Sequence, residues 1–157
     1  MRASTGADLE KRDSSCTTLL ERAISAEDVS LVRDLLERGA SPDSPTKSRM
    51  MMSTAHRAAC LRPPKNAEML HLLISAARAR GAGTLKSLVS ETCKWAKLFE
   101  VTPLHIAAES GGIGAVELLL EAGASPLARA VVSDILGGVQ STRIPADCAT
   151  GHVSLRL

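Results

Sequence analysis

The chain has 157 residues, of which 45% are hydrophobic and 23% charged, and its formal net charge is +2. This balance is typical of a soluble globular protein and gives no basic excess of the kind that nucleic-acid binders carry. The longest apolar stretch, around Leu70 to Ala77, is too short for a membrane span, and the four cysteines form no C-x-x-C pair, which indicates reduced intracellular thiols.

The N-terminal part of the chain predicts a flexible segment followed by two helices. Residues 1–15 are polar and aperiodic. Apolar residues then recur at helical spacing from Leu19 to Ile24 and from Val29 to Leu36. Asp28 is suited to cap the second helix, and Gly39 stands where a helix end needs a left-handed residue.

The middle of the chain predicts a second helix pair and an insertion. Ala55-His56-Arg57-Ala58-Ala59 opens the pair, and Met69 to Ile74 supply the apolar side of its outer helix. Residues 78–100 form the insertion, with a basic, glycine-rich link at 78–83. An amphipathic helix is expected from Thr84 to Phe99.

The C-terminal part repeats the first helix pair. Shifting the chain by 84 residues places Thr18–Pro42 over Thr102–Pro126 without a gap, and 11 of the 25 positions are identical. A shorter segment, Pro145 to Ala149, predicts the opening of a last unit. Between the two, residues Val131 to Leu136 are expected to form a short helix.

The run Thr102-Pro103-Leu104-His105-Ile106-Ala107-Ala108 resembles the signature of the ankyrin-repeat family. The resemblance implies a mainly α fold, an ankyrin-repeat α-solenoid of about four helix-turn-helix units with β-hairpin loops, here with one extra inserted helix. The repeat domain is expected over 16–157, with units at 17–45, 52–77, 101–128 and 142–157.

The same resemblance gives structural roles to the motif residues. It implies that the rings of His56 and His105 bond to backbone near the hairpins and tie neighbouring units together, with Asp147 at the same position of the last unit. The other structural motif positions are Gly39, Thr102, Pro103, Leu104, Ala107, Ala108 and Gly123. The sequence has no nucleophile elbow, P-loop, dinucleotide motif or ligand set at metal spacing, so we expect no enzyme, no cofactor and no metal.

The resemblance also implies a concave binding surface made of hairpin tips and the exposed side of each inner helix. Methionine and aromatic side chains suit such contacts. The candidate partner-binding residues are Met50, Met51, Met52, Trp95, Leu98 and Phe99 at the tips, and Leu61, Glu109 and Ser110 on the inner helices. The alternative is that the Met and aromatic side chains pack under the inserted helix as local core.

We therefore expect a non-catalytic adaptor or scaffold that binds a protein partner as a monomer in the cytoplasm or the nucleus, without nucleic acid or membrane insertion. Two alternatives stay open: a regulatory inhibitor of an enzyme such as a kinase, and the ankyrin portion of a larger multi-domain protein. Ser44-Pro45-Thr46-Lys47 also resembles a proline-directed phosphorylation site, with plain turn chemistry as its alternative.

Overall fold

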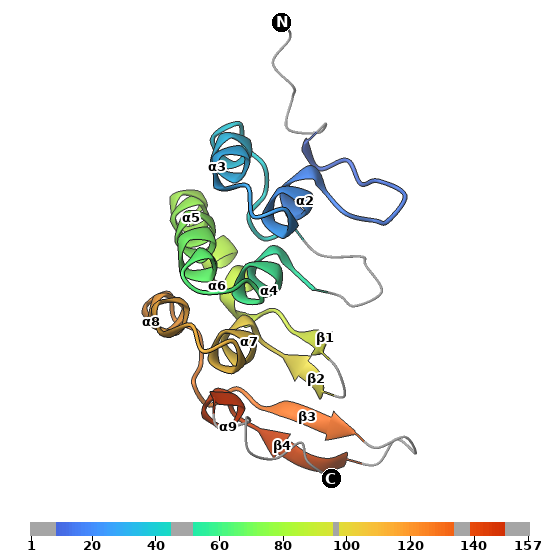
Figure 1. Ribbon diagram of the computed structural model, residues 1–157, viewed down its shortest axis with the longest axis vertical. Helices are drawn as coiled ribbons and strands as arrows, with labels where there is room; N and C mark the ends of the chain where they lie inside the picture. The colour runs from blue at the N-terminus through green and yellow to red at the C-terminus, as the bar shows by residue number, and fades with distance from the viewer. Residues whose placement is uncertain (1–8, 45–51, 96–97, 134–138, 150–157) are drawn as a thin grey trace, which may run out of the picture.

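The helices stack as pairs in two layers. The computed structural model describes residues 9–44, 52–95, 98–133 and 139–149 (Figure 1). The inner layer holds α2 (Leu19–Ser25), α4 (Thr54–Ala59), α7 (Pro103–Glu109) and α9 (Pro145–Ala149), and the outer layer holds α3 (Val29–Glu37), α5 (Lys65–Arg80) and α8 (Ile113–Glu121). The extra helix α6 (Ala82–Ser90) follows α5 and packs against it. The predicted solenoid with one inserted helix is confirmed.

Hairpins project to one side of the helices and join into a single antiparallel sheet (Figure 1). Its strands are β1 (Cys93–Trp95), β2 (Leu98–Val101), β3 (Ala130–Ser133) and β4 (Val139–Arg143), in the order β1-β2-β3-β4. Strand β2 pairs with β3 through Phe99 opposite Val131. The sheet therefore links the hairpin before α7 to the hairpin after α8.

One expected helix ends early in a strand hairpin, and another is a strand over its described part. The helix expected from Thr84 to Phe99 ends at Ser90, and the hairpin of β1 and β2 follows it. The helix expected at Val131 to Leu136 is wrong over its described part, because Val131 lies in β3. Strand pairing satisfies the backbone groups in both segments, with β2 and β3 paired to each other across a long stretch of sequence. In the second segment the β-branched Val131 and Val132 also favour the extended form.

The local signals for helix ends are confirmed. The carboxylate of Asp28 accepts a hydrogen bond from the backbone N–H of Leu31 at 3.0 Å, as an N-cap does. The backbone φ of Gly39 is +99° and that of Gly123 is +94°, which is the left-handed region that favours glycine. These residues end the outer helices of their units at the predicted places.

The turn between paired helices also needs a left-handed residue. Gly111 fills this position between α7 and α8 with φ +71°. The equivalent residue between α2 and α3 is Glu27, whose φ is +57°. A side chain in this region costs about 1–2 kcal/mol, so the first unit carries a strain that the third unit avoids.

The core is aliphatic and runs through the stack. Its largest fully buried side chains are Leu20, Ile24, Met69, Leu70, Leu73, Leu88, Leu104, Ile106 and Leu119. Small residues lie where inner helices meet: Ala58 and Ala59 of α4 and Ala107 of α7 have no exposed surface. Because alanine leaves the backbones close together, α4 and α7 pack directly against each other.

Residues 9–15, within the segment expected to be flexible, contact the first unit. Leu9 is buried in the core. The carboxylate of Glu10 accepts hydrogen bonds from the backbone N–H of Ser41 at 2.7 Å and from the hydroxyl of Ser44 at 3.1 Å. The guanidinium of Arg12 donates to the same Ser44 hydroxyl at 3.1 Å. Ser44 is 4% exposed, so a kinase reaches it only if this contact opens.

Candidate functional site

His56 joins the start of α4 to the hairpin of the following unit. Its Nδ1 accepts a hydrogen bond from the backbone N–H of Ser53 at 3.2 Å and lies 2.7 Å from the Ser53 hydroxyl. Its Nε2 lies 2.8 Å from the carbonyl oxygen of Val101 in β2. Because a carbonyl can only accept, Nε2 carries the proton and donates it. Both ring nitrogens are therefore used.

His105 repeats this arrangement one unit later. Its Nδ1 accepts from the backbone N–H of Thr102 at 3.2 Å and lies 2.8 Å from the threonine hydroxyl. Its Nε2 lies 3.1 Å from the carbonyl oxygen of Arg143 in β4. Burial lowers the pKa of His56 to about 4 and also lowers the pKa of His105. At neutral pH both rings are uncharged links between units, with no nitrogen left for a metal or a proton transfer.

The acidic residues at the same repeat position behave differently. Asp147 accepts a hydrogen bond from the backbone N–H of Ile144 at 3.0 Å, which matches the capping half of the histidine arrangement. A carboxylate has no N–H to donate onward. In the first unit the 84-residue shift places Glu21 at this position.

Glu21 is a buried charge that sequence reasoning missed. Its side chain has no exposed surface. Its two oxygens lie 3.3 Å from Arg12 Nη1 and 3.6 Å from Arg57 Nη2. Burial raises its pKa, although both arginines act to lower it. Glu21 thus connects the N-terminal segment, α2 and α4, and its alignment with His105 was the signal that could have found it.

The remaining motif residues belong to the packing of α7. Thr102, Pro103, Leu104 and Ala107 are buried, and Ala108 is half-buried. Thr102 is the N-cap residue and Pro103 stands at the first turn, where its missing N–H costs no helical hydrogen bond. None of these side chains is available to a partner from solution, apart from the exposed part of Ala108.

The inner-helix candidates differ in how much they expose. Glu109 is exposed, whereas Leu61 is half-buried and packs against the core. The hydroxyl of Ser110 lies 3.1 Å from the carbonyl oxygen of Ala59 and 2.8 Å from that of Ile106. Ser110 therefore helps to hold α7 against α4, and Glu109 is the side chain of the three that solvent reaches best.

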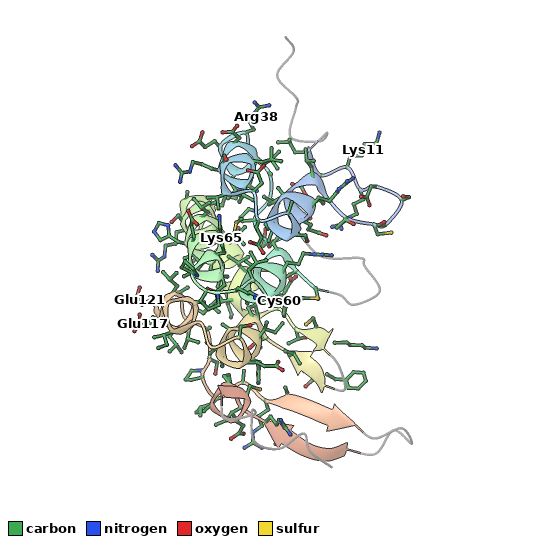
Figure 2. The ribbon with its side chains drawn as sticks, viewed as in Figure 1. Lys11, Arg38, Cys60, Lys65, Glu117 and Glu121 are labelled. Atoms are coloured by element: carbon green, nitrogen blue, oxygen red, sulfur yellow. The ribbon has the colours of Figure 1, made fainter. Side chains whose placement is uncertain are left out.

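Cys60 is the C-cap residue at the end of the inner helix α4 and is half-buried (Figure 2). Burial and, more weakly, the charge of Glu109 raise the pKa of the Cys60 thiol to about 11. The thiol is protonated at neutral pH and is a poor nucleophile. This part of the inner surface therefore offers contact area, not covalent chemistry.

The hairpin candidates divide into buried, half-buried and undescribed side chains. Met52 was expected at an exposed tip but is 7% exposed and belongs to the core, because the chain turns inward there to begin α4. Phe99 is half-buried, and Lys94 Nζ lies 5.1 Å from its ring centroid, within the range of a cation–π contact. Trp95 and Leu98 are paired across β1 and β2, and their side chains lie outside what the structure describes. Met50 and Met51 lie outside the described residues.

Two general properties bear on the class of site. Across residues 9–44, 52–95, 98–133 and 139–149, no three His, Cys, Asp or Glu side chains converge in a way that could hold a metal ion. Within the same ranges, no helix has both the length and the apolar character needed to cross a membrane.

Comparison with known families agrees with the architecture. The family model described as ankyrin repeats, in three copies, matches residues 20–130. This range includes the three helix pairs and the hairpin of β1 and β2. No curated protein matches the chain.

Proposed function

We propose that this chain, which belongs to the ankyrin-repeat family, is a non-catalytic adaptor or scaffold that holds a protein partner on its inner helices and hairpins. Ankyrin repeats are in general protein–protein interaction modules. The observation that carries the proposal is the arrangement of inner helices and sheet, which together present one continuous side of the molecule (Figure 1). A surface built on stacked elements is pre-organised, so little entropy is lost when a partner binds.

The chemistry of this side supports binding over catalysis. The buried histidines use both ring nitrogens, and burial keeps the Cys60 thiol protonated. Accessible residues among those described include Glu109 on α7, Arg22 on α2 and the half-buried Phe99 on β2. We propose that Phe99, together with Trp95 and Leu98, forms the apolar part of the contact, and that Glu109 and Arg22 form its charged rim.

We further propose that the chain acts as a monomer in the cytoplasm or the nucleus. All four cysteines are free thiols, and Cys93 and Cys148 are buried as such, which suits a reducing compartment. Light scattering after size exclusion measures the monomer mass, and fractionation of cells tests the compartment.

The test is affinity capture with the full chain, read by mass spectrometry. A Trp95→Ser, Phe99→Ser double variant and a Glu109→Lys variant are compared with wild type, after circular dichroism shows that each is folded. The matched control is Leu31→Ser, an exposed apolar residue on the outer helix α3. We expect the Trp95→Ser, Phe99→Ser double variant and the Glu109→Lys variant to lose a partner that the Leu31→Ser control retains. Equal capture by all four proteins would place binding elsewhere and contradict the proposal.

The same captured partner separates an adaptor from an inhibitor. If the partner is an enzyme such as a kinase, its activity is measured with and without a saturating amount of the chain. Unchanged activity supports the adaptor, and activity that falls with occupancy supports the regulatory alternative.

A further inference from the structure

A groove of about 420 Å³ runs along the last outer helix. It is lined by α7, by α8 and by the start of α9, on the side of α8 that faces away from α5 (Figure 1). We call it the α8 groove and define it by Leu104, Ala108, Ile113, Val116, Leu120 and Pro145. With the exception of Glu117, its lining side chains are apolar or absent.

The groove has the shape that receives a helix. Ile113, Val116 and Leu120 of α8 are spaced i, i+3 and i+7, so they share one side of that helix. Leu104 of α7 lines the groove from the core without exposed surface, and Ala108, one turn later, is half-buried beside it. Exposed Ile113 and Leu120 next to this apolar lining form the kind of surface against which the apolar side of a third helix packs.

The chain contains a copy of the same surface that is already occupied. The 84-residue repeat pairs Ile113 with Val29 and Leu120 with Leu36. In the first unit α5 packs against α3, and both Val29 and Leu36 are half-buried against the core. In the third unit Ile113 is 76% exposed and Leu120 is 41% exposed. Positions that are half-buried in the first unit, where α5 packs against α3, are therefore more open to solvent in the third.

The charges beside the groove are acidic. Glu117 lines it, and Glu121 follows one turn later on the same helix; both are exposed and project to the outside of the stack (Figure 2). No lysine or arginine lines the groove in the described residues. A partner with basic residues beside its apolar side is therefore favoured over an acidic one.

We propose that the α8 groove binds an amphipathic helix of a protein partner whose apolar side is flanked by lysine or arginine. The occupant takes the place relative to α8 that α5 takes relative to α3. The exposed residues of the groove, Ile113 and Leu120, lie on the outer helix α8, so the proposal goes beyond the inner-face binding proposed above, and its failure would leave that proposal standing.

The test uses two fluorescent peptides of 16 residues, the length of α5. Both carry leucine at i, i+3, i+4 and i+7 spacing; one has lysine at the flanking positions and the other has glutamate. Binding to the full chain is measured by fluorescence anisotropy. We expect the lysine peptide to bind at least about tenfold more tightly than the glutamate peptide.

Variants then locate the binding site. Ile113→Ser and Leu120→Ser should each weaken the lysine peptide by about tenfold. Because both residues are exposed, the variants should keep the wild-type circular dichroism spectrum. Leu31→Ser, an exposed apolar change on α3, is the matched control and should have no effect. Glu109→Lys, on the inner surface, should also have none, which separates this proposal from the first.

Several results would overturn the proposal. One such result is that the chain binds the lysine and glutamate peptides with equal affinity. Another is that the Ile113→Ser and Leu120→Ser variants bind the lysine peptide as tightly as wild type. Binding seen only after residues 150–157 are deleted would mean that the chain's own end occupies the groove. Self-association by analytical ultracentrifugation that Ile113→Ser abolishes would mean that the occupant is a second copy. Failure of both peptides to bind, with or without the deletion, would also overturn it.

Discussion

Gly112 is the position where the packing between units leaves no room for a single methyl group. It caps α8 at the point where this helix meets α5. A Cβ added there would overlap the amide Nδ2 of Asn66 and lie 3.0 Å from its Cγ. Asn66 is 1% exposed, so its short side chain has little freedom to move away. The φ of Gly112 is −83°, which any residue adopts, so a side chain at this position brings no backbone strain and the steric clash is the main cost.

The expected cost of Gly112→Ala follows from these contacts. Overpacking a closed interface costs about 1–3 kcal/mol, and alanine is a poorer N-cap than glycine by roughly 0.5–1 kcal/mol. The free energy of unfolding should therefore fall by about 1.5–4 kcal/mol, with a drop in Tm of roughly 3–16 °C. Urea unfolding followed by circular dichroism measures the first, and a thermal scan measures the second.

Gly114, two residues further along α8, provides a matched control of opposite sign. A Cβ there would lie 3.4 Å from the Cβ of Ala67, which is ordinary contact. Gly114→Ala should stabilise the chain by roughly 0.5–1 kcal/mol, because alanine is the better residue inside a helix. Asn66→Ala combined with Gly112→Ala should recover part of the loss. Equal stability of Gly112→Ala and wild type, or a double variant whose effects simply add, would refute the reasoning.

Further predictions concern protonation, backbone strain and thiol access. Burial lowers the pKa of His56 to about 4 in the folded chain, whereas an exposed histidine has a pKa of about 6.5. Between about pH 4 and pH 6.5 the unfolded chain therefore binds more protons than the folded chain. The free energy of unfolding should therefore fall by up to about 3 kcal/mol from pH 6.5 to pH 4. His56→Gln should lose this part of the pH dependence in urea titrations; an unchanged slope would contradict it. Glu27→Gly should raise the free energy of unfolding by about 1 kcal/mol, because φ is +57°; no gain would argue against strain. Iodoacetamide at pH 8 should modify Cys16 in the native chain, because Cys16 is exposed. Cys93 is 3% exposed, and burial raises the pKa of its thiol to about 12. It should therefore react only after unfolding. Peptide mapping distinguishes the two, and rapid native labelling of Cys93 would count against its burial.

One repeat position carries three residue types because its surroundings differ. His56 and His105 accept a hydrogen bond at the helix start and donate one to a following strand. Asp147 can make only the accepting bond of this pair. Glu21 instead lies between two arginines, one of them from the N-terminal segment. A neutral ring suits a link between two backbone groups, and a carboxylate suits a place where a guanidinium is supplied.

The α8 groove and the inner side would give the chain two binding surfaces with different chemistry. The inner side offers Glu109 and the partly exposed ring of Phe99 on a layer of helices and strands. The α8 groove offers aliphatic side chains with acidic neighbours. A protein that holds two different segments at once fits the role of a scaffold.

The sequence by itself determined the paired helices of the repeat units. Apolar spacing placed these pairs, and Asp28 and Gly39 marked where one outer helix begins and ends. The 84-residue repeat showed that the first and third units are copies. These features depend on side chains and backbone within a few residues of one another, and for that reason a linear pattern is enough to identify them.

Only the tertiary structure decided where strands replace helices and which side chains are covered. The segment around Phe99 has helical spacing, yet it is a strand because Val131, distant in sequence, supplies its backbone partner. Met52 looks like a surface residue in the sequence and is buried because the start of α4 turns it inward. Ile113 and Val29 are equivalent in the repeat, yet Ile113 is exposed and Val29 is half-buried in the unit where α5 packs against α3. Pairing and covering depend on elements that come together only when the chain folds, and no local pattern records them.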